Sequence, residues 1–290
     1  MVMDVDLIKK IQRDFNSFTK GQKLIAEYII NEYDKAAFMT ALSLGETVGV
    51  SESTVVRFAH TLGYDGYKEL QKQLQELVKN KLTTVQRLSM ASQYSNKESA
   101  LKKVMEKDME NIQKTINEIG QGAFQESIDL ILKAKNIYIL GLRSSSFLAG
   151  YLGFYLSFLF KDVKVVTSSA NDVFEQLLRA NSEDVIIGIS YPRYSRRTLE
   201  ALDFCKERGC KIISITDSLI SPAAKYSDIA LTATSDMLSF VDSLVAPMSL
   251  INALIVAIGL EKRENITTCF EELERIWNKY NVYDSDLDNK

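Results

Sequence analysis

The stretch TALSLGETVGVSESTVVRFAHTLG, residues 40–63, predicts two helices joined by a tight turn. Thr40 is placed to cap a short helix from Ala41 to about Val48, because its hydroxyl can accept a hydrogen bond from an amide of the first turn. Gly49 then permits a left-handed turn, and Ser51 is placed to cap the second helix. The order of helix, short turn and helix is typical of a helix-turn-helix motif.

The second helix of this motif is predicted to have an apolar inner face and a polar outer face. The inner face holds Val55, Phe58, Ala59 and Leu62, and the outer face holds Glu52, Ser53, Thr54, Arg57 and His60. In such motifs the start of the second helix enters the major groove of DNA, where hydroxyls and an arginine meet phosphates and base edges. The alternative is that Ser51 is only a cap and Arg57 only a solvated charge.

The charge of the chain does not by itself indicate nucleic-acid binding. The net charge of the 290 residues is −3, and residues 1–80 hold ten Lys or Arg against eleven Asp or Glu. Any affinity for DNA must therefore come from a few well-placed cations and from doubling them in an oligomer. We expect a homodimer or a homotetramer.

A cytoplasmic protein without membrane contact is expected. The first ten residues, MVMDVDLIKK, do not resemble a secretory signal. The apolar runs Leu148 to Phe160 and Pro247 to Leu260 are shorter than the roughly 20 residues that cross a bilayer, and both are interpreted as buried helices. Three cysteines, Cys205, Cys210 and Cys269, lack redox-pair or zinc spacing and are interpreted as reduced core thiols.

A polar stretch over residues 80–96 separates the helical region from the rest of the chain and predicts a domain boundary. A stripe of apolar residues at helical spacing follows: Leu101, Val104, Met105, Met109, Ile112, Ile116 and Ile119. Such a stripe belongs to a core or faces a partner helix, and the same helix of a second subunit is one candidate. Another helix is predicted from Phe124 to Lys135.

The remaining sequence alternates short β-branched runs with helical segments. The runs are NIYILG, VKVVT, DVIIGIS, KIISIT and DIALTA, which begin at residues 136, 163, 184, 211 and 228. This rhythm predicts a parallel sheet with helices on both faces. Ligands of such folds bind beyond the carboxyl ends of the strands, where helix N-termini present free amides.

Two strand-to-helix joints, 141–146 and 190–198, gather hydroxyls and arginines where helices are expected to begin. The candidate anion-binding residues are Arg143, Ser144, Ser145, Ser190, Arg193, Ser195 and Thr198. Charge-assisted hydrogen bonds from such groups suit a phosphate dianion. The alternative is that Ser144 and Ser195 only cap helices and that the arginines are solvated.

The stretch GVSESTVVRFAHTLGYDGYKELQKQL, residues 49–74, resembles the DNA-binding domain of RpiR/MurR-type regulators. The resemblance covers roughly the first 80 residues, and it implies operator recognition by the helix that begins after Ser51. The implied DNA-binding residues are Ser51, Ser53, Thr54, Arg57 and, on the next helix, Lys68.

The region from Phe124 to Leu260 resembles the SIS (sugar isomerase) phosphosugar-binding domain, on the two joints and on ITDS, SPAAKYSDIAL and DSLVAPMSLINALI. Ser145 matches a phosphate-contacting serine of that domain, and Ser190 and Ser195 match hydroxyl positions of its second loop. Arg143 stands where many members have glycine, and Pro192-Arg193 replaces a usual Ser-Gly pair. The two arginines could restore the lost anion contacts or mark another anionic ligand, such as a sugar acid.

The expected fold class is thus an all-α helix-turn-helix domain followed by an α/β SIS domain with a parallel sheet flanked by helices. The expected domains are residues 1–80 for DNA binding, 81–123 as linker and connecting helix, 124–263 for the SIS domain and 264–290 as C-terminal helix and tail.

The resemblances imply a transcription regulator whose operator affinity responds to a phosphorylated sugar or related anionic metabolite. The competing interpretation is a sugar-phosphate isomerase, which needs a base and often a histidine. The one histidine, His60, lies in the helix-turn-helix region, and Glu175 and Glu200 are the remaining candidate bases. We therefore expect no enzyme, no catalytic residues, no cofactor and no metal.

Overall fold

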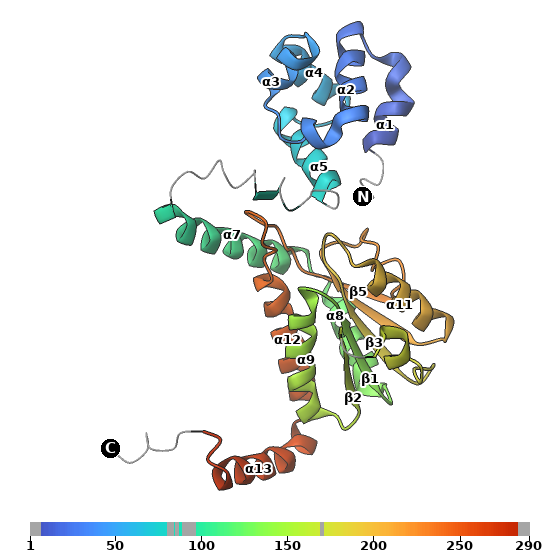
Figure 1. The fold of residues 1–290 in the computed structure, drawn as a ribbon, viewed down its shortest axis with the longest axis vertical. Coiled ribbons are helices and arrows are strands. Elements are labelled where there is room, and N and C mark those ends of the chain that lie inside the picture. Colours follow the sequence, from blue (N-terminus) through green and yellow to red (C-terminus); the bar gives the residue numbers. More distant parts are fainter. Residues whose placement is uncertain (1–6, 80–83, 85–86, 89–96, 169–170, 284–290) are drawn as a thin grey trace. The chain divides into compact units, whose positions relative to one another are not determined.

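The computed structural model describes residues 7–79, 84, 87–88, 97–168 and 171–283 (Figure 1). The chain divides into two compact units, residues 1–93 and 94–290, and each is described by itself. The polar connection predicted over residues 80–96 lies outside the described residues, except for Thr84, Arg87 and Leu88.

The regular elements of the first unit, in its described residues, are all helices. Its elements are α1 (Leu7–Asp14), the 3₁₀ turn η1 (Phe15–Ser17), α2 (Lys20–Ala36), α3 (Ala41–Val48), α4 (Glu52–Thr61) and α5 (Tyr67–Lys79). Thr19 begins α2 with a capping box, in which its Oγ1 accepts from the Gln22 amide and Gln22 Oε1 accepts from the Thr19 amide. Thr40 Oγ1 accepts from the Ser43 amide at 3.1 Å, so the cap predicted for α3 is confirmed.

The core of this unit lies under α4, as the periodicity predicts. The four inner residues Val55, Phe58, Ala59 and Leu62 are buried. The Phe58 ring meets the edge of Phe18 with centroids 5.2 Å apart, a favourable aromatic geometry. Gly49 has a φ of 76°, which is the left-handed turn expected between α3 and α4. The helix-turn-helix is therefore present.

The second unit is an α/β domain. Its helices are α7 (Lys97–Glu118), α8 (Gln121–Lys133), α9 (Ser145–Leu159), α10 (Val173–Gln176), α11 (Arg196–Glu207), α12 (Val245–Glu261) and α13 (Arg263–Lys279). Its strands are β1 (Ile137–Gly141), β2 (Val163–Val166), β3 (Val185–Ile189), β4 (Lys211–Thr216) and β5 (Ile229–Thr232). All five predicted strands are confirmed, and they form one parallel sheet in the order β2-β1-β3-β4-β5 (Figure 1).

Helices cover both faces of this sheet. Helices α8, α9 and α12 pack over one apolar cluster, which contains Ile139 and Ile187, and α10 and α11 pack over another, which contains Leu140 and Ile186. Successive strand residues thus point to opposite buried faces. This explains why β1 and β3 are continuous apolar runs rather than alternating ones.

The structure decides between the alternatives left open for one apolar segment and corrects two other expectations. Most of the predicted apolar stripe of α7 is exposed, including Leu101 at 70% and Met109 at 69%, so it is not part of this unit's core. The outer sides of α9 and α12 are also exposed, as at Phe154 and Val256, although their inner sides are buried as predicted. Among the thiols, Cys269 on α13 is exposed and is therefore no core residue.

Candidate functional site

A cluster of hydroxyls lies at the start of α4. Ser51 occupies the N-cap position, but its side chain makes no capping bond, so that part of the prediction is wrong. Its Oγ lies instead 2.9 Å from Ser53 Oγ and 2.9 Å from Thr54 Oγ1. The three hydroxyls therefore form one polar group at the exposed N-terminal end of the helix, where the helix dipole favours an anion.

Arg57 extends this group by one helical turn. Its guanidinium is exposed, and Nη2 lies 3.5 Å from Thr54 Oγ1. Lys68 is exposed on α5. His60 Nδ1 lies 3.0 Å from the Tyr64 carbonyl oxygen, so one ring nitrogen is engaged locally. The five sequence-predicted residues of this region thus come from α4, the turn before it and the neighbouring α5.

In the second unit, the order of the strands brings the two predicted anion loops together. Strands β1 and β3 are neighbours, and Gly141 at the end of β1 is in register with Ile189 at the end of β3. Strand β2 lies on the other side of β1, so the direction of the crossovers reverses between β1 and β3. Open α/β sheets bind ligands at such a switch point. The loops after β1 and β3 begin side by side there.

The first loop is compressed between β1 and α9. A Cβ on Gly141 would lie 2.5 Å from the Ser145 carbonyl oxygen, so only glycine lets the start of α9 approach the strand end this closely. Arg143 is exposed and has a φ of 56°, a strained conformation for a side-chain-bearing residue. Ser145 is buried at the first position of α9, whereas Ser144 is exposed and makes no capping bond.

The second loop repeats several of these features. Arg193 is exposed and has a φ of 55°, and Ser190 at the strand end is buried. Ser195 Oγ accepts from the Thr198 amide at 3.3 Å, so the capping alternative holds for Ser195, although not for Ser144. Thr198 is 1% exposed, and its hydroxyl has no hydrogen-bond partner in the described part of the chain.

The other cations near α11 are engaged locally. Arg196 pairs with Glu200 at 2.8 Å, and Arg197 pairs with Asp172. The hydrogen bond from Arg197, followed by that from the Phe174 amide, lowers the pKa of Asp172. By contrast, the Arg143 side chain forms no ion pair with any described residue.

Asp217, Tyr191 and Tyr194 lie beside this site and were not among the residues predicted from the sequence. Asp217, directly after β4, accepts hydrogen bonds from Tyr194 Oη at 2.8 Å and from Thr216 Oγ1 at 3.2 Å. Tyr191 is buried, its hydroxyl has no partner among the described residues, and burial raises its pKa well above the ordinary value. The position of ITDS at a strand end was the sequence signal that could have found Asp217.

The candidate bases of an isomerase are engaged in local structure. Glu175 closes a capping box at the start of α10 by accepting from the Asp172 amide at 3.2 Å, and Glu200 pairs with the arginines of α11. No group of three or more His, Cys, Asp or Glu within the described ranges is arranged to hold a metal ion. No described helix is long and apolar enough to cross a membrane.

Comparison with protein families matches both units. The model of the rpiR-family helix-turn-helix domain matches residues 5–81, and that of the SIS domain matches residues 130–257. The chain thus combines an rpiR-family helix-turn-helix domain with a SIS domain. An HTH-type transcriptional regulator of Clostridium perfringens is 26% identical over 79% of this chain and 82% of its own length. The HTH-type transcriptional regulator HexR of Pseudomonas aeruginosa is 23% identical over 89% of this chain and 90% of its own.

Solved structures share the fold of this chain. The sugar isomerase domain of an RpiR transcription factor from Sphaerobacter thermophilus superposes with a TM-score of 0.59 and 28% identity, over 61% of this chain and 99% of that one. Vibrio vulnificus NanR, solved with ManNAc-6P, gives a TM-score of 0.57 at 19% identity over 95% of this chain and 99% of its own. The first supports the SIS assignment of the second unit, and the second shows a shared fold.

The unpartnered hydroxyl of Thr198 leads to a stability prediction. A buried polar group without a hydrogen bond costs about 1–3 kcal/mol, so Thr198→Val should raise the free energy of unfolding by about 1 kcal/mol. Thr216→Val is the matched control, because it removes a hydroxyl that is bonded to Asp217 and should lower that free energy by about 1 kcal/mol. Urea unfolding followed by Trp277 fluorescence measures both. Equal destabilisation by the two variants would contradict the assignment.

Proposed function

We propose that this protein is a transcription regulator that binds operator DNA through α4 and senses a phosphorylated sugar, or a related anionic metabolite, in its SIS domain. The observation that carries the proposal is the presence, in one chain, of an exposed hydroxyl and arginine group on a helix-turn-helix and of two Ser/Arg loops at the switch point of the sheet. Its relatives are named transcriptional regulators, and one neighbour was solved with a sugar phosphate.

DNA would be contacted by Ser51, Ser53, Thr54, Arg57 and Lys68. The hydroxyls at the start of α4 suit phosphate oxygens, and the Arg57 fork can reach a base edge from the same face. Lys68 on α5 is suited to a backbone phosphate, which attracts a cation irrespective of sequence. Specificity would thus depend on Arg57 and general affinity on Lys68.

We expect Arg57→Ala to weaken binding to the DNA upstream of the protein's own operon by about 1–3 kcal/mol if the guanidinium reads a base. Lys68→Ala should instead weaken binding to operator and random DNA alike and reduce the salt dependence of both. Fluorescence anisotropy titrations on the two DNAs, at several salt concentrations, separate these effects. Unchanged operator affinity of Arg57→Ala would exclude the proposed role.

The ligand would be held between the loops after β1 and β3. Arg143 and Arg193 supply cations, and Ser145, Ser190 and Thr198 supply buried hydroxyls at or near helix starts. These donors suit a phosphate without a metal ion, because charge-assisted hydrogen bonds and helix-start amides both favour a dianion. The remaining residues of the proposed contact set, Ser144 and Ser195, lie in the same loops.

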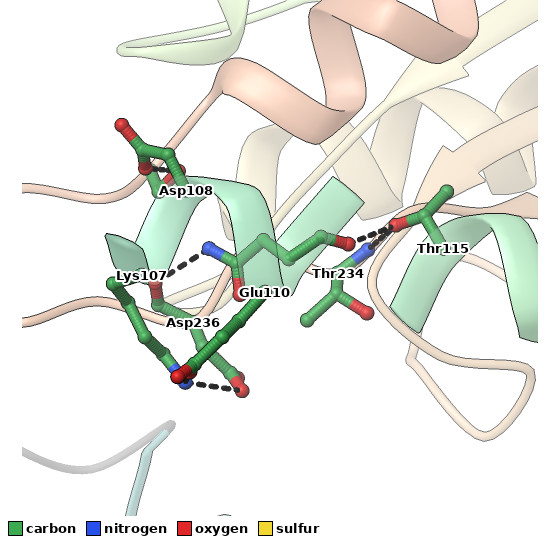
Figure 2. A network of polar contacts seen from close by, with 8 residues as sticks. Lys107, Asp108, Glu110, Thr115, Thr234 and Asp236 are labelled. Carbon is green, nitrogen blue, oxygen red and sulfur yellow. Dashed lines mark hydrogen bonds and ion pairs between the residues drawn. The ribbon is translucent and has the colours of Figure 1, made fainter. Parts of the chain in front are cut away.

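The contacts of α7 indicate how binding could reach the DNA-binding unit, since α7 is the helix that precedes the SIS domain in the chain. Its buried polar face is bonded to the loop between β5 and α12 (Figure 2). Thr115 Oγ1 accepts from the Thr234 amide at 2.9 Å, and Asn111 Nδ2 donates to the Asp236 carbonyl at 2.9 Å. Asp108 accepts from the Ser243 hydroxyl at 2.6 Å.

This loop is also joined to the strand that leads to the candidate ligand site. The Ala233 amide donates to the Thr216 carbonyl at 2.8 Å, and the Thr216 hydroxyl donates to Asp217. A ligand that displaces Asp217 or Tyr194 would thereby disturb the loop that holds α7. Regulation requires only that the ligand bind one conformation of the protein more tightly than another. The coupling free energy between ligand binding and DNA binding would then be about 1–3 kcal/mol.

Calorimetry with a panel of sugar phosphates and sugar acids, with and without operator DNA, tests this proposal. Arg193→Ala should weaken ligand binding roughly 10- to 100-fold, because one charge-assisted hydrogen bond is lost. Thr115→Val should leave ligand binding near wild type but reduce the effect of the ligand on DNA affinity. Thr267→Val, which removes an exposed hydroxyl of α13 that bonds one turn back as Thr115 does, is the control and should change neither quantity. Tight ligand binding by Arg193→Ala would place the site elsewhere.

We also propose that the protein acts as a homodimer or homotetramer, with the outer sides of α9 and α12 as the contact between copies. Helix α9 has no charged residue, and large apolar side chains protrude from both helices, including Phe154 at 57% exposed and Leu260 at 69%. An apolar groove of about 360 Å³ runs between α9, α12 and α13, lined by residues such as Phe158 and Trp277. Helices that are apolar all round are usually buried, and a two-fold axis would bury this surface against itself.

Sedimentation velocity at micromolar concentration should therefore show a dimer or a tetramer. Val256→Glu should shift the protein toward smaller species, because a charge in a buried apolar contact is unfavourable. Lys161→Glu, an exposed change outside α9 and α12, should leave the distribution unchanged. A monomeric wild type would contradict the proposal.

A further inference from the structure

The C-terminal end of α11 brings two cysteines together. The Cys210 amide donates to the Cys205 carbonyl at 3.1 Å, and the Gly209 amide donates to the Lys206 carbonyl at 3.0 Å. Gly209 has a φ of 77°. These bonds define a Schellman motif, in which the residues at the two ends of the longer bond usually make an apolar side-chain contact across the helix end. In this protein both of those residues are cysteines.

The two thiols are both buried, at the same helix end and beneath an exposed turn. Cys205 is fully buried and Cys210 is 4% exposed, whereas Arg208 and Gly209 above them are exposed. The interaction between the two thiols, together with burial, raises the pKa of Cys205, and the same interaction lowers the pKa of Cys210. Because the thiolate is the reactive form, Cys210 is the nucleophile of the pair.

We propose that Cys205 and Cys210 are a redox modification site, which closes to an intramolecular disulfide in the folded protein when it meets a hydroperoxide. A disulfide requires Cα atoms about 4.4–6.8 Å apart with side chains directed toward each other. The main-chain hydrogen bond that joins the two residues brings their backbones close, and both side chains are buried at the same helix end.

The chemistry balances with hydrogen peroxide as the oxidant. The Cys210 thiolate attacks one peroxide oxygen, an S–O bond forms, the O–O bond breaks, and the departing hydroxide takes a proton to become water. The Cys205 thiol then loses its proton and attacks the Cys210 sulfur, so that the S–S bond forms and the hydroxyl group leaves as a second water. Two thiols lose two electrons in total, and one peroxide gains them.

The proposed bond would fix the C-terminal end of the helix whose first turn carries Ser195 and Thr198. The cysteine pair belongs to the end of α11 and is independent of the proposed regulation. Cys269 provides an internal contrast, since it is exposed on α13 and belongs to no such pair.

The test uses the full chain with Cys269→Ser. The folded protein is treated with hydrogen peroxide, quenched with catalase, unfolded in urea with N-ethylmaleimide, and analysed by intact mass. We expect a mass lower by two hydrogen atoms, no maleimide adduct, and recovery of both adducts after dithiothreitol. Trypsin can cut after Lys206 and Arg208, so the bond should appear as two peptides joined by a reducible link.

Single variants distinguish the roles of the two thiols. Cys205→Ser should leave a Cys210 sulfenic acid that dimedone traps, whereas Cys210→Ser should give little dimedone adduct. Circular dichroism before the quench confirms that each protein is folded. Two maleimide adducts on the oxidised, folded protein, or a disulfide that forms only in urea, would overturn the proposal.

Discussion

The parallel pairing of β1 with β3 is the constraint on which the rest of the second unit depends. It places Gly141 beside Ile189, so that two loops far apart in the sequence begin at the same edge of the sheet. Because the crossovers leave in opposite directions from these two strands, their helices do not cover the space between the loops. The proposed anion site therefore depends on this reversal of the crossover direction between β1 and β3.

The two loops at this edge of the sheet contain strained backbone and buried hydroxyl groups without hydrogen bonds. Arg143 and Arg193 both adopt positive φ values near 55°, which L-residues other than Gly, Asn and Asp rarely do. Buried Thr198 and Tyr191 add hydroxyls without hydrogen bonds in the described chain. Strained backbone and unpaired buried groups both reduce stability, and proteins retain them mainly where function requires it. Their concentration at one sheet edge distinguishes this region from the opposite end of the strands.

Helix α7 shows how a helix can be amphipathic and yet present its apolar side to solvent. Its buried positions Asn111 and Thr115 bond to main-chain groups of the loop after β5, which has no ladder partner for those groups. The polar side is therefore held by the domain, and Leu101 and Met109 are left outside. A hydrophobic surface of this kind in a single copy is consistent with a further partner helix.

The sequence by itself determined the local structure, the strands and the core of the helix-turn-helix. Caps such as Thr19 and Thr40, the inward face of α4 and the five β-branched runs depend on neighbours within a few residues, so their pattern is sufficient to predict them. It also identified the two loops of the candidate site, because hydroxyls and arginines follow strands there.

Only the tertiary structure decided which of those groups are available and what surrounds them. The Ser51 hydroxyl bonds to other hydroxyls rather than to an amide of the helix, and Arg197 forms an ion pair with Asp172. Asp217, which follows a different strand, accepts a hydrogen bond from Tyr194 beside the site. These outcomes depend on contacts between segments distant in sequence, for which periodicity and capping rules carry no information. The direction of α7 was decided in the same way, since its polar side is hydrogen-bonded to a loop more than a hundred residues away along the chain.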